Sequence, residues 1–534
     1  MTLLRSASIS VILSTVVIMG GCSNKDKGPS AEKSAPAAAL GLKAPSDKVF
    51  AKHFDVPSRT VSDAEGKQAL AALSLLNQNT EGLNWAETSG ADGNYSYTDL
   101  TVKDEDGQLS IAKANLIGVH MDGETATFDR ADFSGIKIYD ETENTTVTMG
   151  TLSVARPTPD MAKAIITSLQ NIRDLDDLDL EIDEEDLDMG FGALGMGDVN
   201  ITSEDLNLST KSLMWGEDSD SGLTDFKIQD VTFKLTENAE EPVTASLKSF
   251  SGTGFRGDML DNLPDRGRSP LGMMGGFNPL AKIYDTIKME DLDFNSSFVS
   301  VTSEGFEGKS TEKGGVTTQK SVGEPFIIRL KEAPKDPQAK QAYNMVKELG
   351  FDEIVLQSSQ TTILDANEDT IAVKDGLLSM KDGFKLSYNY GASGVKAMTD
   401  KMQSMDRADM SPRESQSEMQ AAMADMKLEG FQMRLEDQSI VERGLKLAGK
   451  FRGATPDQVK KEMKVALALA PMMARGLEGE MLGEISGAFG EFIENGGTLS
   501  IVVDPKEPLS VTELADYKRS NLTMDDIGFS AKAE

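Results

Sequence analysis

Residues 92–111 read DGNYSYTDLTVKDEDGQLSI, and this stretch sets the pattern for much of the chain. Its apolar side chains alternate with polar ones at Tyr95 and Tyr97, Leu100 and Val102, and Leu109 and Ile111. Asp-Gly pairs at 92–93 and 106–107 flank the first run, and tight hairpins favour this dipeptide. A period of two with such turns predicts antiparallel strands that bury one face and turn the other to water.

The same period continues from about residue 80 to 330, as in FKIQDVTFKL at 226–235. Helices are predicted where a capping residue precedes a proline, at Thr158-Pro159, Asp336-Pro337, Ser411-Pro412 and Thr455-Pro456. Ser62 and Glu65 form a further capping box before an apolar run. The sequence therefore predicts an α+β fold. We expect an elongated, mainly antiparallel sheet with helices packed on one face and a helix content that rises toward the C-terminus.

Composition divides the chain into four parts. Residues 1–21 form a signal peptide, and residues 22–60, rich in Ala, Pro, Ser and Lys, form a flexible tether. A β-rich domain with acidic and Gly/Met-rich loops is expected at 61–330, and an α+β domain at 331–534. In the latter, an apolar stripe from Thr455 to about Glu494 predicts an amphipathic helix that is kinked near Pro471.

Cys22 is the only cysteine, and it ends a segment with a recognisable layout. Arg5 supplies a positive charge, an apolar run follows from Ile9 to Met19, and Gly20 and Gly21 precede the cysteine. The apolar run is much shorter than the ~20 residues of a spanning helix. An ordinary signal peptide with an incidental cysteine is the alternative.

This segment resembles the lipobox of bacterial lipoprotein precursors, with Met19 where Leu is more usual. The resemblance implies diacylglyceryl transfer to the Cys22 thiol and cleavage after Gly21. Ser23 follows instead of an aspartate, which by the same resemblance favours the outer membrane of a Gram-negative envelope, facing the periplasm. A Gram-positive surface stays open.

The net negative charge limits the classes of molecule that this chain can bind. Loss of residues 1–21 removes one charged side chain, so the 54 basic residues become 53 against 87 acidic ones, formally −34. Such a chain repels nucleic acid. Its charge also argues against electrostatic docking on anionic headgroups, so we expect membrane attachment to depend on the lipid at Cys22. A basic protein partner or Ca²⁺ remains compatible with this charge.

Two segments resemble ligand-binding motifs, but the residues in and around them argue against a binding site. Gly190, Gly192 and Gly195 fit G-x-G-x-x-G, but the acidic run 174–188 precedes them, so a mobile Gly/Met loop is expected. That acidic run spaces carboxylates as a Ca²⁺ loop does, yet Ile182 stands at the turn position that needs glycine. A solvated acidic face is therefore the favoured interpretation.

Catalysis has no recognisable centre in the sequence. The mature chain has two histidines, His53 and His120, and lacks G-x-S-x-G, HExxH and CxxC patterns. We expect no catalytic residues, no metal and no cofactor. A hydrolase with dispersed carboxylates stays as a distant alternative.

Three apolar segments are rich in Met and Gly or Ala: 189–197, 269–279 and 465–474. Methionine adapts to irregular partners, so these segments could line a groove for an acyl chain. The plainer interpretation is a packed core helix with two mobile loops.

The C-terminal ~200 residues resemble uncharacterised proteobacterial envelope proteins. The similarity rests on LGFDEIVL at 349–356, DGFKLS at 382–387, LEDQSIVER at 435–443 and LSIVVDPKEPL at 499–509. It implies an envelope location and no activity.

The leading hypothesis is a membrane-tethered, non-catalytic envelope lipoprotein that binds an amphiphile or assists envelope assembly. The alternative is an acidic structural or adaptor lipoprotein that binds a protein partner or Ca²⁺.

Overall fold

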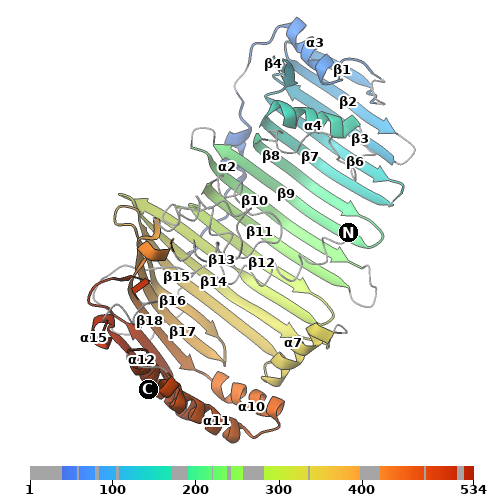
Figure 1. Cartoon of the computed structure of the whole chain (residues 1–534). Helices are drawn as coiled ribbons and strands as arrows, with labels where there is room; N and C mark the ends of the chain where they lie inside the picture. The colour runs from blue at the N-terminus through green and yellow to red at the C-terminus, as the bar shows by residue number, and fades with distance from the viewer. Residues whose placement is uncertain are drawn as a thin grey trace. The chain divides into compact units, whose positions relative to one another are not determined.

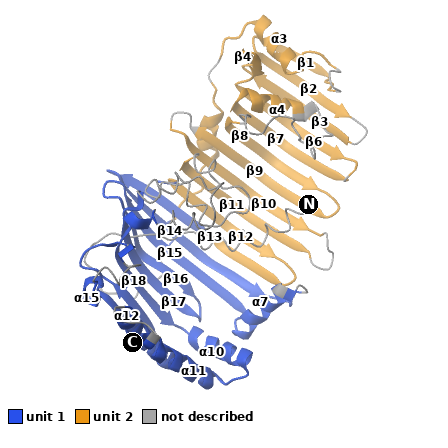
Figure 2. Cartoon of the chain, viewed as in Figure 1, with its two compact units in different colours: residues 1–40, 258–283, 306–534 blue, residues 41–257, 284–305 orange. Residues whose placement is uncertain are grey.

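A computed structural model defines the part of the chain considered below. It describes residues 39–56, 59–78, 83–103, 107–142, 144–170, 190–218, 221–236, 242–256, 282–334, 337–396, 421, 423–473, 477–510, 512–513 and 522–534. These residues fall into two compact units (Figure 2). The N-terminal unit holds the described residues of 41–257 and 284–305. The C-terminal unit holds those of 306–534, with residues 39–40 and 282–283.

An open antiparallel sheet forms the N-terminal unit (Figure 1). Its strands pair in chain order: β1 Glu87–Ala91, β2 Asn94–Lys103, β3 Gly107–Ile117, β6 Arg130–Asp140, β7 Thr145–Pro157, β8 Phe191–Thr202, β9 Leu206–Asp218, β10 Leu223–Leu235, β11 Val243–Arg256 and β12 Thr286–Asn295. A small separate hairpin joins β4 His120–Asp122 to β5 Thr125–Thr127. The described helices of this unit are α2 Asp47–Ala51, η1 Lys52–Phe54, α3 Asp63–Ala72 and α4 Pro159–Gln170. The predicted antiparallel sheet is confirmed.

The main hydrophobic core lies between one face of β2, β3, β6 and β7 and the helices α3 and α4. The alternating apolar side chains of residues 95–111 belong to this core, and Tyr97 is 2 % exposed. One half of the predicted capping box is present at the start of α3, where the Ser62 hydroxyl accepts the N–H of Glu65 at 3.3 Å. The alternation of apolar and polar residues in the sequence therefore corresponds to a sheet face that is buried in the structure.

Helices lie on both faces of this sheet, so the prediction of one covered face is wrong. The α3 and α4 helices pack on the face that carries Leu100 and Leu152. The η1 helix lies on the other face, where the Phe54 ring comes close to Gly195. Successive residues of a strand point to opposite faces, which is why Gly195 and the neighbouring Leu194 serve different surfaces. Helix content also does not simply rise along the chain, because the strands β8 to β14 follow α4 with no helix among their described residues.

The predicted Gly/Met loop at 189–197 is a strand in its described part. Phe191–Thr202 is β8, paired with β7 and β9. Gly195 leaves room for Phe54, since a Cβ there would lie 3.0 Å from the Phe54 ring. Glycine in this strand therefore allows close approach rather than a turn.

A left-handed residue recurs on every second strand of the sheet. These residues are Asp99 on β2 (φ 51°), Gly135 on β6 (φ 63°), Asp198 on β8 (φ 49°), Asp230 on β10 (φ 49°) and Asp291 on β12 (φ 46°). The pairing register brings them into one row, with Ala112, Gly150, Lys211 and Lys248 on the strands between. Glycine and aspartate tolerate this conformation better than most residues do.

The C-terminal unit is also built on antiparallel strands. Its elements are β14 Val316–Leu330, α7 Pro337–Glu348, β15 Glu353–Asp365, β16 Thr370–Met380, β17 Phe384–Ser393, η5 Met423–Asp425, β18 Lys427–Asp437, α10 Ile440–Arg452, α11 Pro456–Leu469, η6 Ala470–Met473, α12 Leu477–Asn495, β19 Thr498–Val503, β20 Leu509–Ser510, α15 Met524–Ile527 and β21 Phe529–Ala533. The boundary between the units falls within β13, Val299–Lys313.

The α12 helix covers one face at the end of this sheet. Ala488 and Phe492 of α12 pack on Leu499 of β19, which is fully buried. The predicted capping box is present at Thr455, and the helix is interrupted at Pro471 as expected, because α11 gives way there to η6.

Candidate functional site

The apolar face of the sheet continues beyond the part that α3 and α4 cover. On β8 to β12 it consists of Leu194, Met196, Leu213, Trp215, Phe226, Ile228, Phe250, Ile287 and Met289. We call this set the open apolar face. The residues Met196, Leu213, Ile228, Phe250 and Met289 stand directly opposite one another across five strands. The face is therefore continuous from strand to strand.

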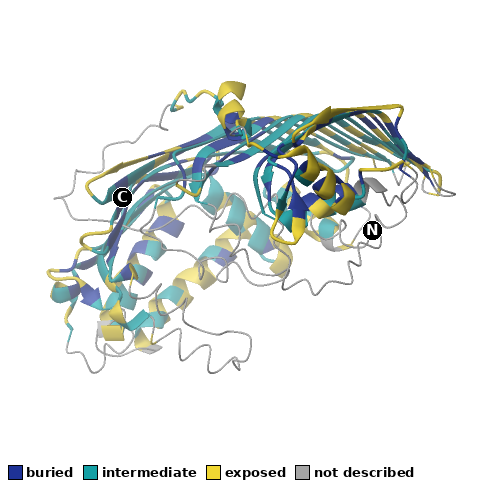
Figure 3. Cartoon of the chain, turned by 90° about the horizontal axis from the view of Figure 1, so that it is seen from above, coloured by how far each residue is buried: buried dark blue, intermediate teal, exposed yellow. Residues whose placement is uncertain are grey.

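Burial separates this face from the main core. All of its side chains are of intermediate exposure, and none belongs to the buried cluster beneath α3 and α4. The corresponding side chains on β2 and β3, such as Leu100 and Ile111, are at most 3 % exposed. Much of the sheet has the intermediate colour in Figure 3. Neither α3 nor α4 packs on it in the described structure, so an apolar ligand could bury it further.

Aromatic rings cross the strands at one edge of the open apolar face. Trp215 stacks on Phe226 at 6.2 Å between ring centroids, and Phe226 contacts Phe255 at 5.1 Å. Phe255 in turn stacks on Tyr284 at 5.6 Å. Gly252 makes room for this row, because a Cβ there would lie 2.4 Å from the Phe255 ring. The rings form a firm apolar wall beside the aliphatic side chains.

The dimensions suit a chain-like apolar ligand. Five strands at a spacing of ~4.8 Å span about 19 Å. One leaflet of a bilayer contributes about half of a hydrocarbon core that is ~30 Å thick, so an acyl chain reaches roughly 15 Å. An acyl chain therefore fits across the face.

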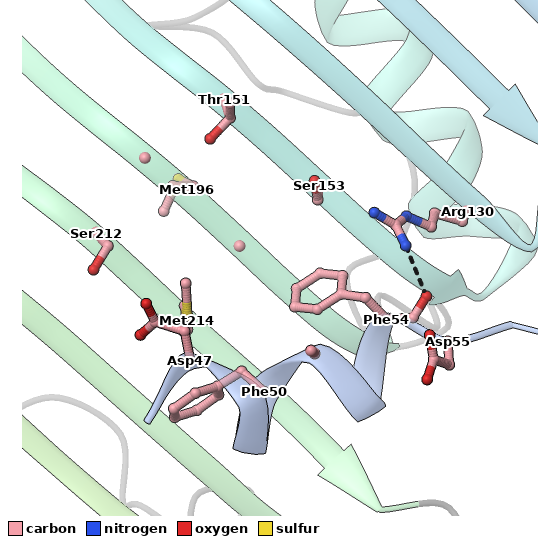
Figure 4. A pocket seen from close by; sticks show the side chains of 13 residues that line it. Asp47, Phe50, Phe54, Asp55, Arg130, Thr151, Ser153, Met196, Ser212 and Met214 are labelled. Carbon is pink, nitrogen blue, oxygen red and sulfur yellow. Dashed lines mark hydrogen bonds between the residues drawn. The ribbon is translucent and has the colours of Figure 1, made fainter. Parts of the chain in front are cut away.

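Polar and small residues occupy the other face of these strands. Here α2 and η1 lie over β7, β8 and β9 and leave a cleft of about 400 Å³, lined in part by Thr151, Ser153 and Ser212 (Figure 4). Arg130 closes one end, donating to the Phe54 carbonyl oxygen at 3.0 Å and pairing with Asp132 at 2.9 Å. Asp47, Asp55 and Arg130 add charged groups to the lining of this cleft.

Several charged groups fasten that segment to the polar face. His53 Nε2 lies 3.0 Å from the Asp225 carboxylate, and both residues are buried. Lys227 donates to Asp47 at 2.9 Å, although the Lys227 side chain is only 7 % exposed. Arg156 donates to the His53 carbonyl oxygen at 2.8 Å. Residues 47–54, within the span predicted as a tether, are thus part of the folded unit.

A further set of charged contacts on this face involves Lys288. Lys288 pairs with Glu290 at 3.0 Å and also donates to the Leu42 carbonyl oxygen. The Lys288 ammonium lowers the pKa of Glu290, and a hydrogen bond from the Ser249 hydroxyl at 2.8 Å lowers it further. These contacts join the Leu42 backbone to β12.

The predicted site residues are mostly not described. Gly21, Cys22, the acidic run 174–188 and the segment 269–279 lie outside the described residues. Both histidines are buried with partners of their own, and the His120 ring lies 2.7 Å from the Gly118 carbonyl oxygen.

No group of three or more His, Cys, Asp or Glu residues in the described part could hold a metal ion. None of the described helices is long and apolar enough to cross a membrane.

A second cleft, of about 520 Å³, lies between α11 and α12 in the C-terminal unit. Gly483, Gly487 and Gly490 line it from α12, and Leu467 and Pro471 line it from α11 and η6. The described part of the third Met-rich segment, 465–473, therefore contributes to a cleft and to the surface rather than to a filled core.

Comparison with known families places only the C-terminal region. A family model described as an uncharacterised protein matches residues 377–534, which include α10, α11 and α12. This confirms the predicted similarity of the C-terminal region to an uncharacterised family, and the description of that family names neither a cellular location nor an activity. A comparison with curated proteins found no match.

Proposed function

We propose that this protein is a non-catalytic lipoprotein of the bacterial cell envelope whose N-terminal unit binds an amphiphile through its acyl chain. The open apolar face carries the proposal: it presents a continuous set of half-buried apolar side chains across five strands. Monomeric proteins rarely expose large contiguous apolar patches without a function.

The Cys22 thiol is the attachment point for the membrane lipid in this proposal. Acylation of Cys22 and cleavage after Gly21 place the folded units in the envelope, at the periplasmic side of the outer membrane. A tether from Cys22 to the first described residues keeps the open apolar face within reach of a lipid source.

Trp215 provides a direct test of acyl-chain binding. The chain has two tryptophans, and Trp85 is 7 % exposed in the main core, so Trp85→Phe leaves Trp215 as the reporter on the open apolar face. A fatty acid brominated along its chain should quench Trp215 fluorescence, and the unbrominated fatty acid should reverse the quenching by competition.

Matched substitutions on β10 give the control. Ile228→Asp places a charge in the middle of the open apolar face, and Thr232→Asp places the same charge at an exposed position farther along the same strand. We expect Ile228→Asp to weaken binding by roughly 10-fold or more, since a lost apolar contact and a desolvated charge together cost about 1–3 kcal/mol. Equal binding by both variants, or no quenching of Trp215, would reject the proposal.

The anchor is tested separately. Mass spectrometry of the protein from cell membranes should find a diacylglyceryl-modified Cys22 as the N-terminal residue. Cys22→Ala should release the folded chain from the membrane fraction, and an unmodified Cys22 within an intact leader would overturn the anchor.

A further inference from the structure

Exposed apolar side chains gather on three neighbouring segments of the C-terminal unit. Among the described residues, seven large apolar side chains are strongly exposed, and five of them lie between 451 and 472. They are Phe451 on α10 (63 %), Met463 (38 %), Val465 (60 %) and Leu469 (50 %) on α11, and Met472 on η6 (80 %). Met463 lies on the same side of α11 as Val459 and Leu467, so we call the other four residues the outer stripe.

The outer stripe is separate from the packed side of α11. Val465, Leu469 and Met472 follow one another at i, i+4 and i+7, which puts them on one side of the helix. Val459 is 1 % exposed on the packed side, and Leu467 lines the cleft toward α12. The helix therefore has a second apolar side that faces solvent.

The charge of this region is opposite to that of the whole chain. Residues 440–473 contain seven basic and three acidic side chains, a formal charge of +4 in a chain of −33. The Lys446, Lys450 and Arg452 side chains are 60–66 % exposed. Five of the seven cations have acidic partners within 4 Å: Lys446 with Glu442, Lys450 with Glu348, Arg452 with Glu462, and Lys460 and Lys464 with Glu494. Glu348 and Glu494 lie outside 440–473, and counting them reduces the surplus from +4 to +2.

We infer that the α10–α11–η6 region docks on a membrane surface that contains anionic lipids. A helix with an apolar side and lysine or arginine beside it lies in the interface, with its apolar side in the headgroup and acyl boundary. The overall acidity of the chain argued against electrostatic docking. The local surplus of positive charge reverses that argument at this one region. The inference does not depend on Cys22 or on the open apolar face.

A lipid surface fits the outer stripe better than a protein does. The stripe is convex, because it runs along the solvent side of a helix, whereas a protein groove would need a partner shaped around it. Methionine and leucine between lysines adapt to a fluid interface without a fixed geometry. A second copy of this chain, which is strongly acidic overall, is kept as an outcome of the test.

Vesicle binding tests the inference. The chain from Ser23 onward contains every described residue and lacks the anchor, so any binding comes from the folded protein. It should sediment with vesicles of phosphatidylethanolamine and phosphatidylglycerol, and not with vesicles of phosphatidylcholine alone. Binding should fall at least 5-fold between 50 mM and 500 mM salt, because the exposed charges are screened.

Substitutions in the outer stripe give the decisive comparison. Val465→Glu with Leu469→Glu should lower vesicle binding at least 10-fold, and both side chains are exposed enough for the fold to tolerate the change. Met345→Glu on α7, which is 40 % exposed and outside the stripe, is the matched control and should bind normally. Ile228→Asp should also bind vesicles normally, which separates this inference from the proposed acyl-chain site.

Three results would overturn the inference. The unaltered chain fails to sediment with anionic vesicles, or the double variant binds them as well as the unaltered chain does. In the third, light scattering finds a stable dimer that only the double variant loses, and this assigns the outer stripe to a second copy.

Discussion

Gly216→Ala should loosen the segment that α2 and η1 form on the polar face of the N-terminal unit. A Cβ at Gly216 would lie 2.4 Å from both Cγ and Cδ2 of His53. Ordinary carbon contacts need about 3.5 Å, so the His53 ring must retreat by roughly 1 Å. The ring is buried at 4 % exposure, and Arg156 holds its backbone, so the segment has to move with it.

The cost follows from the contacts that this movement breaks. The bond between His53 and Asp225 is 3.0 Å long and would open. Asp225 still accepts a hydrogen bond from the N–H of Gly254 at 3.0 Å. The cost of losing the bond to His53 is therefore near the lower end of the ~1–3 kcal/mol for a buried group that loses its partner. Overpacking adds ~1–3 kcal/mol. We expect a total of about 2–4 kcal/mol, which lowers the melting temperature of a unit of this size by roughly 5–15 °C.

Trypsin reports the movement independently of melting. Lys48 and Lys52 lie in α2 and η1, and cleavage there needs the segment to leave the sheet, so Gly216→Ala should speed both cuts. Gly444→Ala is the control: nothing lies within 4 Å of a Cβ on that helical residue, so the change should leave these cuts alone. In the background of His53→Ala the Gly216→Ala cost should shrink by at least ~1 kcal/mol. Unchanged melting and unchanged cleavage in Gly216→Ala would refute the close fit.

Three further outcomes follow from single residues. Burial raises the pKa of Tyr97 well above its ordinary value, so the folded state holds this proton more tightly than the unfolded state does. Stability should therefore be complete below about pH 10 and fall above it by up to ~1.4 kcal/mol per pH unit, and melting curves at pH 8–11 should lose this slope in Tyr97→Phe. Asp230→Val puts a β-branched residue at φ 49° and should cost about 1–2 kcal/mol in chemical denaturation, whereas Asp230→Gly should cost little. Gly487→Ala in α12 meets nothing within 4 Å and should raise the stability of the C-terminal unit by up to ~1 kcal/mol; a loss would show that the cleft beside it must stay empty.

The strands could be predicted because their signal is local. Tyr95 and Tyr97 alternate with polar residues, and this alternation is expected of a strand in a sheet that buries one face. The faces on which helices lie could not be predicted, since nothing local to Phe54 indicates that it meets Gly195, which is 141 positions away in the sequence.

The glycine-rich segment at 190–197 was misread for a related reason. Glycine marks both turns and close approaches, and only the tertiary neighbour distinguishes them. The signal was present in the regular spacing of Gly195 and Gly197, which fall on one face of a strand.

The site was predicted only in outline. The alternation at 226–235 identified the apolar side chains, but it predicts that a face is buried without saying what buries it. The plainer interpretation of the segment 465–474 was a packed core helix. Part of α11 points to solvent instead, because Val465 and Leu469 form a second apolar side that a count of apolar spacings cannot separate from the first.

The left-handed residues define a structural repeat in the N-terminal sheet. Asp198, Asp230 and Asp291 occupy equivalent places on alternate strands, so the repeating element is a pair of strands that carries one such residue. Insertion of a single strand would put the next Asp out of phase with the row, whereas insertion of a whole pair would leave every register intact. A sheet built in this way can lengthen or shorten only in steps of two strands, about 10 Å each. Among related chains, the reach of the apolar surface should therefore vary in discrete increments rather than continuously.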